Sequence, residues 1–364
     1  MTSSLRGTDR PLSQVYDVAL LDLDGVVYVG PDAVPGAPEA LARARSDGMR
    51  LAFVTNNAAR PPSVVAAHLT ELGIAAEPAE VVTSSQAAAR HLAERLPEGA
   101  HVLVVGTAGL VEALRERGLV PVDDADGPVD AVVQGFSPEL NWRLLAEGAI
   151  ALNRGVPWVA TNVDPTVPSP RGPLPGNGSL VAALRHATGR DPVITGKPDP
   201  AMHRESLLRS GADRPVVVGD RLDTDIEGAN AGGCASLLVL SGVTTPTDLI
   251  HAGPELRPTY VAADVAGLLM AHPQPDVVEG GSRCGRWRVA QDGPVLRLGA
   301  DRPEGGASDD GAADSAESGE LDALRALCAA AWGAAGEVGR DWRIQVEDGD
   351  DGSARGLLER WRLG

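Results

Sequence analysis

The sequence contains almost no lysine. Its 32 basic residues comprise 31 arginines and a single lysine, Lys197. A lone ammonium among guanidinium groups marks a place where a compact point charge serves better than a planar fork. Lys197 is therefore a candidate functional residue before any motif is considered.

Cysteine is also scarce. The three cysteines, Cys234, Cys284 and Cys328, lie far apart and form no CxxC pair. This number and spacing argue against a disulfide framework and against a cysteine-based zinc site. We expect buried, unreactive thiols.

Long apolar runs and net positive charge are missing as well. No segment approaches the roughly 18 apolar residues of a membrane helix, and residues 1–17 lack the apolar stretch of a signal peptide. The formal charge of −18 argues against nucleic acid and anionic membrane as partners, because both require a basic face. We expect a cytoplasmic protein that holds any anion through backbone N–H groups, a metal ion and a few cations.

Short apolar segments alternate with helical segments along most of the chain, which is typical of parallel sheets covered by helices. The alternation begins at 18–23, and a second alternating unit with strands at 102–105, 131–134 and 158–161 interrupts it. We expect an α/β fold with a Rossmann-like parallel-sheet core and an inserted α/β cap domain. The expected limits are 14–85 and 192–275 for the core and 86–191 for the cap.

The composition changes after about residue 275. Asp292-Gly293 between two apolar segments predicts a β-hairpin. An acidic stretch rich in Gly, Ala and Ser at about 300–320 reads as a solvated linker. We expect a small α+β module at 280–364, with a helix at 321–335, a strand at 341–346 and a helix at 354–361. Four of the six tryptophans fall in this module, and we expect them to pack its core.

Two aspartates, Asp22 and Asp24, follow the first apolar segment and precede Gly25. Ligands of open α/β sheets bind at the carboxyl ends of the strands. One carboxylate of such a pair can attack phosphorus while the other protonates the leaving oxygen. The alternative is an ordinary turn, in which Asp and Gly are common.

Three further segments carry polar side chains at strand ends. Asp220, Asp223 and Asp225 follow the apolar segment 215–219 and offer the oxygen ligands that Mg²⁺ prefers, although they could also cap a helix. Thr55, Asn56 and Asn57 end the second strand of the core, and Lys197 lies at another strand end. A strand end before a helix favours an anion, but a plain loop and a solvated lysine are the alternatives.

Taken in order, D-x-D-G-V-x-Y, T-N-N, G-K-P-x-P and G-D-R-L-x-T-D resemble the haloacid dehalogenase superfamily at its four signature positions. More narrowly, they resemble the subfamily of NagD and p-nitrophenyl-phosphatase-like enzymes, over roughly residues 15–272. The loops T-N-V-D-P at 161–165 and P-G-N-G-S at 175–179, with the extra C-terminal module, most resemble actinobacterial glycerol-3-phosphate phosphatases.

The resemblance implies a Mg²⁺-dependent phosphatase that acts on a small phosphorylated metabolite through an aspartyl-phosphate. Asp22 would be the nucleophile and Asp24 the general acid and base. Mg²⁺ would be bound by Asp22, the main-chain carbonyl of Asp24, and Asp220, and Asp225 would orient the site from behind. Thr55 and Lys197 would assist catalysis, and the expected substrate contacts are Thr55, Asn56, Asn57, Asn162, Arg171, Asn177 and Lys197.

Several alternatives stay open at the level of sequence. Glycerol 3-phosphate is the expected substrate, and phosphoglycolate and aryl or sugar phosphates are the alternatives. Some relatives carry a histidine where this chain has Val167, so their specificity does not transfer. A catalytically idle ligand-binding or scaffold protein is the alternative from another class, and a homodimer is left open. The C-terminal module resembles part of an acetyltransferase-type fold, but without a glycine-rich acyl-CoA loop we expect no acetyl transfer.

Overall fold

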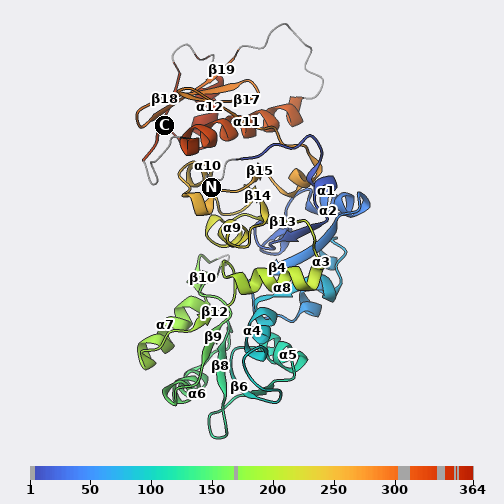
Figure 1. Ribbon diagram of the computed structural model, residues 1–364, viewed down its shortest axis with the longest axis vertical. Coiled ribbons are helices and arrows are strands. Elements are labelled where there is room, and N and C mark those ends of the chain that lie inside the picture. The colour runs from blue at the N-terminus through green and yellow to red at the C-terminus, as the bar shows by residue number, and fades with distance from the viewer. Residues whose placement is uncertain are drawn as a thin grey trace.

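Three units follow one another along the long axis of the molecule, with the core between the cap and the C-terminal module (Figure 1). The computed structural model describes residues 5–167, 171–301, 312–333, 341–347, 350 and 352–363. Within this part of the chain, every helix is too short or too polar to cross a bilayer.

A six-stranded, wholly parallel sheet forms the core, in the order β15-β14-β13-β1-β4-β5. Its strands are β1 Val18–Leu21, β4 Arg50–Thr55, β5 Val81–Thr83, β13 Pro215–Gly219, β14 Ala235–Val239 and β15 Tyr260–Ala262. Helices cover both faces, which explains why β1 is a continuous apolar run and is buried along its whole length. The expected fold class is confirmed.

Residues that commonly begin helices mark the starts of helices in the core. Pro62 occupies the first turn of α3, and the Asp199 carboxylate accepts the backbone N–H of Ala201 to cap α8. The α-helices are α1 Leu12–Val15, α2 Ala37–Ser46, α3 Pro62–Glu71, α8 Pro200–Ser210, α9 Glu227–Ala231 and α10 Pro246–Ile250. A π-helical turn spans Leu222–Ile226, 3₁₀ turns span Pro78–Glu80, Pro254–Leu256 and Val265–Leu269, and a small hairpin pairs β2 Tyr28–Val29 with β3 Asp32–Ala33.

The cap contains a second parallel sheet, in the order β12-β9-β8-β6-β7. Its elements are α4 Ser84–Ala93, β6 His101–Val105, α5 Ala108–Glu116, β7 Val120–Val122, β8 Ala131–Gln134, α6 Trp142–Asn153, β9 Trp158–Ala160, α7 Asn177–Thr188 and β12 Val193–Ile194. β12 pairs with β9, so this strand, expected to open the second part of the core, joins the cap sheet instead. The other domain limits stay predictions.

The proline- and glycine-rich loop between β9 and α7 contains a short hairpin that sequence reasoning missed. β10 Thr166–Val167 pairs with β11 Leu174–Pro175. Two-residue strands leave almost no periodic signal, which is why the segment was expected to be a loop throughout. Figure 1 shows the hairpin on the side of the cap that faces the core.

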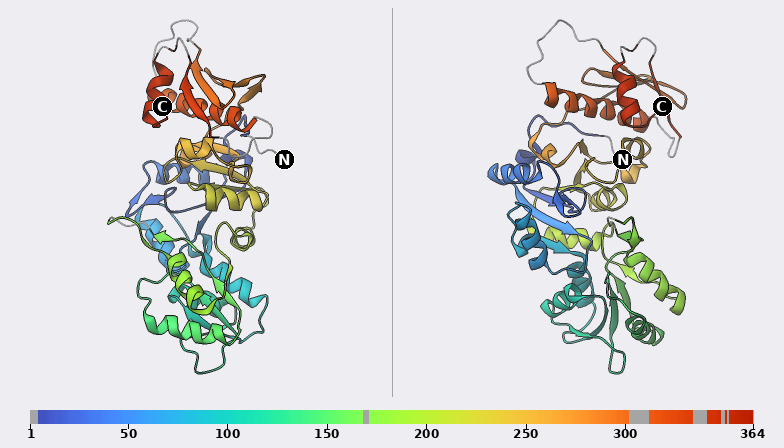
Figure 2. Two further views of the ribbon diagram at one scale, coloured as in Figure 1. Left: turned by 90° about the vertical axis from the view of Figure 1, so that its left-hand side faces the viewer. Right: turned by 180° about the vertical axis from the view of Figure 1, so that it is seen from behind.

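The C-terminal module is a five-stranded sheet with a long helix against it. Its elements are β16 Asp276–Val278, β17 Gly281–Cys284, β18 Trp287–Asp292, β19 Val295–Ala300, α11 Ala312–Gly333, β20 Arg343–Val346 and α12 Ser353–Arg360. The hairpin expected at Asp292-Gly293 is present as β18 and β19. In Figures 1 and 2, α11 lies between this sheet and the core.

The expectation of a solvated linker at 300–320 is wrong in part. α11 begins at Ala312, nine residues before the predicted start, because alanine and glutamate are strong helix formers that extend the helix beyond its apolar stripe. Residues 302–311 lie outside the described residues, as do 334 and 335 at the predicted end of this helix.

The buried positions of the module agree with the sequence. Trp287, Trp332 and Trp342 are buried in one hydrophobic cluster, and Trp361 packs against it. All three cysteines are free. Cys284 and Cys328 are buried as expected, whereas Cys234 is half-buried beside His203. Burial raises the pKa of each thiol, as expected for unreactive cysteines.

Candidate active site

The polar residues that follow several strands meet at one edge of the core sheet, beneath the cap. Asp22 directly follows β1, and its N–H donates to the carbonyl of Val218 on β13 at 2.8 Å. Thr55 ends β4, and Asp220 directly follows β13. Lys197 arrives from the cap sheet, three residues after β12 ends. Residues far apart in the sequence therefore form a single site.

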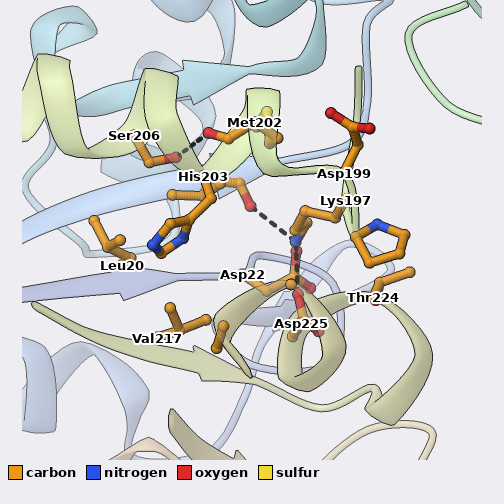
Figure 3. Close-up of a pocket in the computed structure, with 14 residues that line it drawn as sticks. Leu20, Asp22, Lys197, Asp199, Met202, His203, Ser206, Val217, Thr224 and Asp225 are labelled. Atoms are coloured by element: carbon orange, nitrogen blue, oxygen red, sulfur yellow. Dashed lines mark hydrogen bonds and ion pairs between the residues drawn. The ribbon is translucent and has the colours of Figure 1, made fainter. Parts of the chain in front are cut away.

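The Lys197 ammonium lies at the centre of this site (Figure 3). Its Nζ donates to the carboxylate of Asp22, to Oδ1 of Asp225 at 2.8 Å and to the carbonyl of Val54 at 3.2 Å. Three donors thus meet three acceptors, and only 12% of the side chain is exposed. The two carboxylates raise the pKa of Lys197 in spite of its burial, so the ammonium stays charged.

Asn56 holds the Lys197 loop in place. Its side-chain Oδ1 accepts the backbone N–H of Lys197 at 2.8 Å, and its Nδ2 donates to the Lys197 carbonyl at 3.2 Å. The same Nδ2 reaches the carboxylate of Asp164 in the cap at 3.3 Å. The carbonyl of Asn56 accepts from Ser84 at 2.6 Å and from Asn162 at 2.8 Å. Asn56 thus joins the core to both ends of the cap.

Three carboxylates form a group that can hold a cation. Asp22, Asp220 and Asp225 each offer one oxygen, and these oxygens lie within 4.8 Å of one another. Oδ2 of Asp220 accepts the N–H of Val243 at 2.7 Å, but Oδ1 is buried and has no hydrogen-bond partner among the described residues. Burial raises the pKa of Asp220 to about 6. A buried, unpartnered carboxylate oxygen beside two other carboxylates fits a divalent metal ion with oxygen ligands.

Two glycines lie directly against Asp220 in this group of carboxylates. Gly25 has a φ of +86°, and a Cβ there would come within 2.5 Å of the Asp220 carboxylate. A Cβ on Gly242 would collide with the same oxygen. The backbone on both sides therefore approaches Asp220 as closely as glycine alone permits.

Burial also affects the nucleophile candidate. It raises the pKa of Asp22 well above the usual range, and the neighbouring Asp225 acts in the same direction, while Lys197 opposes both. Because the charged form of Asp22 is costly without cations, Lys197 and a bound metal ion are the groups that would keep it ionised.

Asp24 lies on the open side of the site. Its side chain is exposed to solvent, but nearby protein atoms remove part of the hydration of the carboxylate, and this desolvation raises its pKa above the ordinary value. Lys197, Arg60 and His68 oppose this rise through their positive charge. A carboxyl group with a raised pKa that solvent can reach is suited to passing a proton.

The T-N-N segment forms a tight turn after β4. The N–H of Asn57 donates to Thr55 Oγ1 at 3.1 Å, and Oδ1 of Asn57 accepts the N–H of Ala59 at 2.8 Å. Thr55 is buried, with 3% exposed, whereas Asn57 is exposed. A hydroxyl that accepts one bond can still donate another, so Thr55 keeps the capacity to bind an oxyanion.

The cap asparagines predicted to contact substrate are engaged with the main chain. Asn162 Nδ2 donates to the carbonyl of Asn56, and Asn177 Nδ2 donates to the carbonyl of Asn162 at 2.7 Å. Both side chains are buried, which indicates that they fix the cap loop over the site. Arg171 lies exposed between β10 and β11.

Sequence reasoning did not single out two parts of the site. Asp164 was noted only as part of the T-N-V-D-P segment and was given no role, although its carboxylate accepts from Asn56 and burial raises its pKa. The loop after β14 was not considered at all, yet it supplies Gly242 and Val243 to Asp220. The small residues of S-G-V-T-T at a strand end were the available signal.

A cavity of about 30 Å³ lies on the core side of Lys197. Figure 3 shows it between α8 and strand β1, with Leu20, Met202, His203 and Val217 on its walls. This volume suits about one water molecule. It is too small for a phosphate ester.

Known proteins with similar sequences identify the fold family. A family model described as haloacid dehalogenase-like hydrolase matches residues 19–120, and one described as HAD-hydrolase-like matches residues 194–268. D-glycerol 3-phosphate phosphatase of Mycobacterium tuberculosis is 44% identical over an alignment 362 residues long, which covers 97% of this chain and 96% of that enzyme. The chain belongs to the haloacid dehalogenase-like hydrolases.

Solved structures agree with this assignment. The crystal structure of glycerol phosphate phosphatase from M. tuberculosis in complex with magnesium has a TM-score of 0.84 and 42% identity, and it covers 98% of this hydrolase and 100% of that chain. The p-nitrophenyl phosphatase from Archaeoglobus fulgidus has a TM-score of 0.64 and 33% identity, and it covers 70% of this chain and 98% of its own. The resemblance read from the four motifs is confirmed.

Proposed function

We propose that this haloacid dehalogenase-like hydrolase is a magnesium-dependent phosphatase that hydrolyses D-glycerol 3-phosphate to glycerol and phosphate. The observation that carries the proposal is the contact of Lys197 with Asp22 and Asp225, beside the unpartnered carboxylate oxygen of Asp220. This arrangement places a candidate nucleophile, Asp22, beside a cation for the phosphate, Lys197, and beside a carboxylate that can bind a metal ion, Asp220.

The metal fits the acidic group described above. Asp22 and Asp220 would hold Mg²⁺ through carboxylate oxygens. The main-chain carbonyl oxygen of Asp24 would be a further ligand, as predicted from the resemblance. Asp225 is engaged elsewhere, since its Oδ1 accepts from Lys197 and its Oδ2 accepts the N–H of Arg221 at 3.2 Å. It therefore serves to position the other groups. When bound, Mg²⁺ neutralises charge on the nucleophile and on the phosphoryl oxygens.

The aspartates would divide the chemistry between them. The carboxylate of Asp22 attacks phosphorus, and the bond between phosphorus and the glycerol oxygen breaks as the aspartyl-phosphate forms. Asp24 gives its proton to the leaving oxygen. The Asp24 carboxylate then takes a proton from a water molecule that attacks the phosphoryl group, which releases phosphate and restores Asp22.

The cation and the T-N-N turn would hold the phosphoryl oxygens during both steps. Lys197 is placed against the attacking carboxylate, so its charge acts on the group that changes most. Thr55 offers a hydroxyl, and Asn56 and Asn57 lie in the turn that follows. The chain carries a formal charge of −18, so the molecule as a whole does not attract an anionic substrate. These local groups must supply that attraction.

The substrate is proposed from the similarity to the M. tuberculosis enzyme over almost the whole of both chains. Phosphoglycolate and aryl or sugar phosphates are the alternatives. An idle binding protein is disfavoured, because Asp22 and Asp24 are both present beside Lys197. A cytoplasmic location and a homodimer stay predictions from the sequence.

Phosphate release from a panel of phosphate esters, with Mg²⁺ and with EDTA, tests the proposal. We expect D-glycerol 3-phosphate to have the highest kcat/KM in the panel, and we expect EDTA to abolish turnover. Asp22→Asn should lower kcat by at least about 1,000-fold, because the amide cannot form the aspartyl-phosphate.

Asp223→Asn is the matched control. Asp223 belongs to the same acidic segment as Asp220, but its side chain is 64% exposed and pairs with Arg221, so its loss should leave kcat within twofold. Full activity of Asp22→Asn would refute the mechanism. A higher kcat/KM for phosphoglycolate would keep the mechanism and replace the substrate.

A further inference from the structure

One hydrophobic cluster runs without interruption from the C-terminal module into the core. On the module side it contains the inner face of α11, including Leu324, Leu327 and Trp332. On the core side it contains Ile226, Leu238, Leu249, Ile250 and Val261. The module therefore shares its packing with the core.

Polar contacts fix the two sides of this cluster to each other. The indole Nε1 of Trp332 donates to the carbonyl of Ile250 at 3.3 Å, and the buried Arg325 donates to the carbonyl of Val261 at 2.8 Å. The guanidinium of Arg257 lies 5.2 Å from the centre of the Trp332 ring. α11 is thus held against α10 and against β15, the edge strand of the core sheet.

Core segments that belong to this cluster, or lead into it, lie next to the carboxylates of Asp220 and Asp225. α10 begins at Pro246, and the loop that leads into it bonds to Asp220 twice: the N–H of Val243 donates to the carboxylate at 2.7 Å, and the N–H of Thr244 donates to the main-chain carbonyl at 3.1 Å. Ile226, which is fully buried in the shared cluster, directly follows Asp225. Asp225 is thus next to a member of the shared cluster, and Asp220 is bonded by the loop that leads into α10, which α11 contacts through Trp332.

We propose that the C-terminal module braces the metal-binding carboxylates, and that Trp332 is a positioning residue for Asp220 through α10. The proposal rests on the magnesium site of the proposed function. By holding α10, the module limits the movement of the loop that bonds Asp220, and through the shared cluster it supports Ile226 beside the positioning residue Asp225, which lowers the cost of ordering Asp220 around a cation.

The comparison with a shorter phosphatase supports an added role for part of this chain. The A. fulgidus enzyme aligns over 98% of its own length with only 70% of this chain. The remaining 30% of the present chain has no counterpart there. A phosphatase of this fold thus exists without that extra length, which favours tuning of the site over supply of a catalytic group.

Trp332→Phe tests the brace, because it keeps an aromatic ring and removes the N–H that bonds to Ile250. The matched control is Trp287→Phe. Trp287 is buried in the same cluster, lies on β18 of the module, and its Nε1 has no hydrogen-bond partner among the described residues. Mg²⁺ affinity of the full chain is measured by titration calorimetry without substrate, and kcat is measured separately at saturating Mg²⁺.

We expect Trp332→Phe to bind Mg²⁺ about three- to tenfold more weakly than the parent, with kcat at saturating Mg²⁺ unchanged. Trp287→Phe should bind Mg²⁺ like the parent. Ile226→Val, a milder change directly behind Asp225, should also weaken Mg²⁺ binding, and it serves if Trp332→Phe does not fold.

Parental Mg²⁺ affinity in both Trp332→Phe and Ile226→Val would overturn the brace. Equal weakening by Trp287→Phe and Trp332→Phe would also overturn it, since general loosening of the module would then be the cause. A parent protein that binds no Mg²⁺ would refute the metal site of the proposed function and this inference with it.

Discussion

Lys197 shows how tightly one side chain can be specified by its surroundings. Its ammonium satisfies two carboxylates and one carbonyl in a space that leaves 12% of the side chain exposed. The chain uses arginine at every other Lys or Arg position, including the buried Arg257 and Arg325. At this position a planar fork would be too wide and would present its donors in the wrong directions.

Replacing the ammonium by a guanidinium is therefore expected to damage catalysis severely. Lys197→Arg keeps the charge, but we expect kcat to fall by about 100-fold or more, as for loss of a donor aimed at developing charge. Steady-state kinetics at saturating Mg²⁺ measures the effect. Arg204→Lys, at a side chain that is 62% exposed, should change kcat by less than twofold. Parental kcat in Lys197→Arg would show that only charge matters here.

The residues proposed to carry the chemistry could be singled out from the sequence, as could Asp225 behind them, whereas most of the contacts that position them could not. Asp22, Lys197 and Asp220 stand at strand ends, and the carboxyl ends of parallel strands meet at one edge. Asn56 was expected to bind phosphate, but its side chain is occupied by the main chain of Lys197. Val243 acts through its backbone N–H, which any residue type except proline could supply, so its identity carries no signal.

At the scale of elements, α4 and α8 are joined by a buried group of charges. The carboxylate of Glu205 on α8 is fully buried and accepts from Arg90 on α4, from Arg117 just beyond the end of α5 at 3.1 Å, and from Arg209 on its own helix. Burial alone would raise the pKa of Glu205, but the arginines lower it below the ordinary value. α8 begins at Pro200, so this cluster also holds the helix that follows the Lys197 loop.

Removing the charge of Glu205 is expected to destabilise the protein. Glu205→Gln leaves three arginines around a neutral amide, and we expect the free energy of unfolding to fall by about 3 kcal/mol. Urea denaturation measures it. Glu94→Gln breaks the exposed pair with Arg204 and should cost less than about 0.5 kcal/mol. An equal loss of unfolding free energy in the two variants would argue that the burial of Glu205 does not matter.

Strands that form distinct apolar segments could be predicted from the sequence, and several of the shortest ones could not. β1, β8 and the hairpin of β18 and β19 were expected within a few residues of their observed bounds. β5, β7 and β15 are three residues long and show no periodicity that could be recognised without their neighbours. β12 was assigned to the wrong unit because two apolar residues at a domain border fit either sheet, and only pairing with β9 decides between them.

For the molecule as a whole, His272 joins the N-terminal segment to the end of the core. Its backbone pairs with Thr8, and its Nε2 contacts the carbonyl of Gly267 at 2.9 Å. The ring is buried, and its Nδ1 has no partner among the described residues. Burial, with a smaller effect of Arg325, lowers the pKa of His272 to about 4.

This buried imidazole predicts a loss of stability in acid. Between pH 6.5 and about 4 the unfolded chain binds a proton at His272 and the folded protein does not, so stability falls as pH falls through this window. The slope is at most about 1.4 kcal/mol per pH unit for this group. In His272→Gln, which keeps a donor for the Gly267 carbonyl, urea denaturation across this range should show a shallower slope. Identical slopes in parent and variant would refute the assignment.

The two connections between core and cap converge on Asn56, where Ser84 at the start of the cap and Lys197 just beyond its end both bond to one residue. An insertion whose ends lie side by side adds little loop-closure cost to its host, because the host chain is already closed at that point. A replacement cap running from α4 to β12 would leave all six strands of the core sheet behind, but it would have to supply partners for the buried Glu205 of α8 in place of Arg90 and Arg117. Two connections, Asn56 and the Glu205 cluster, therefore set the conditions under which a different cap could be joined to this core.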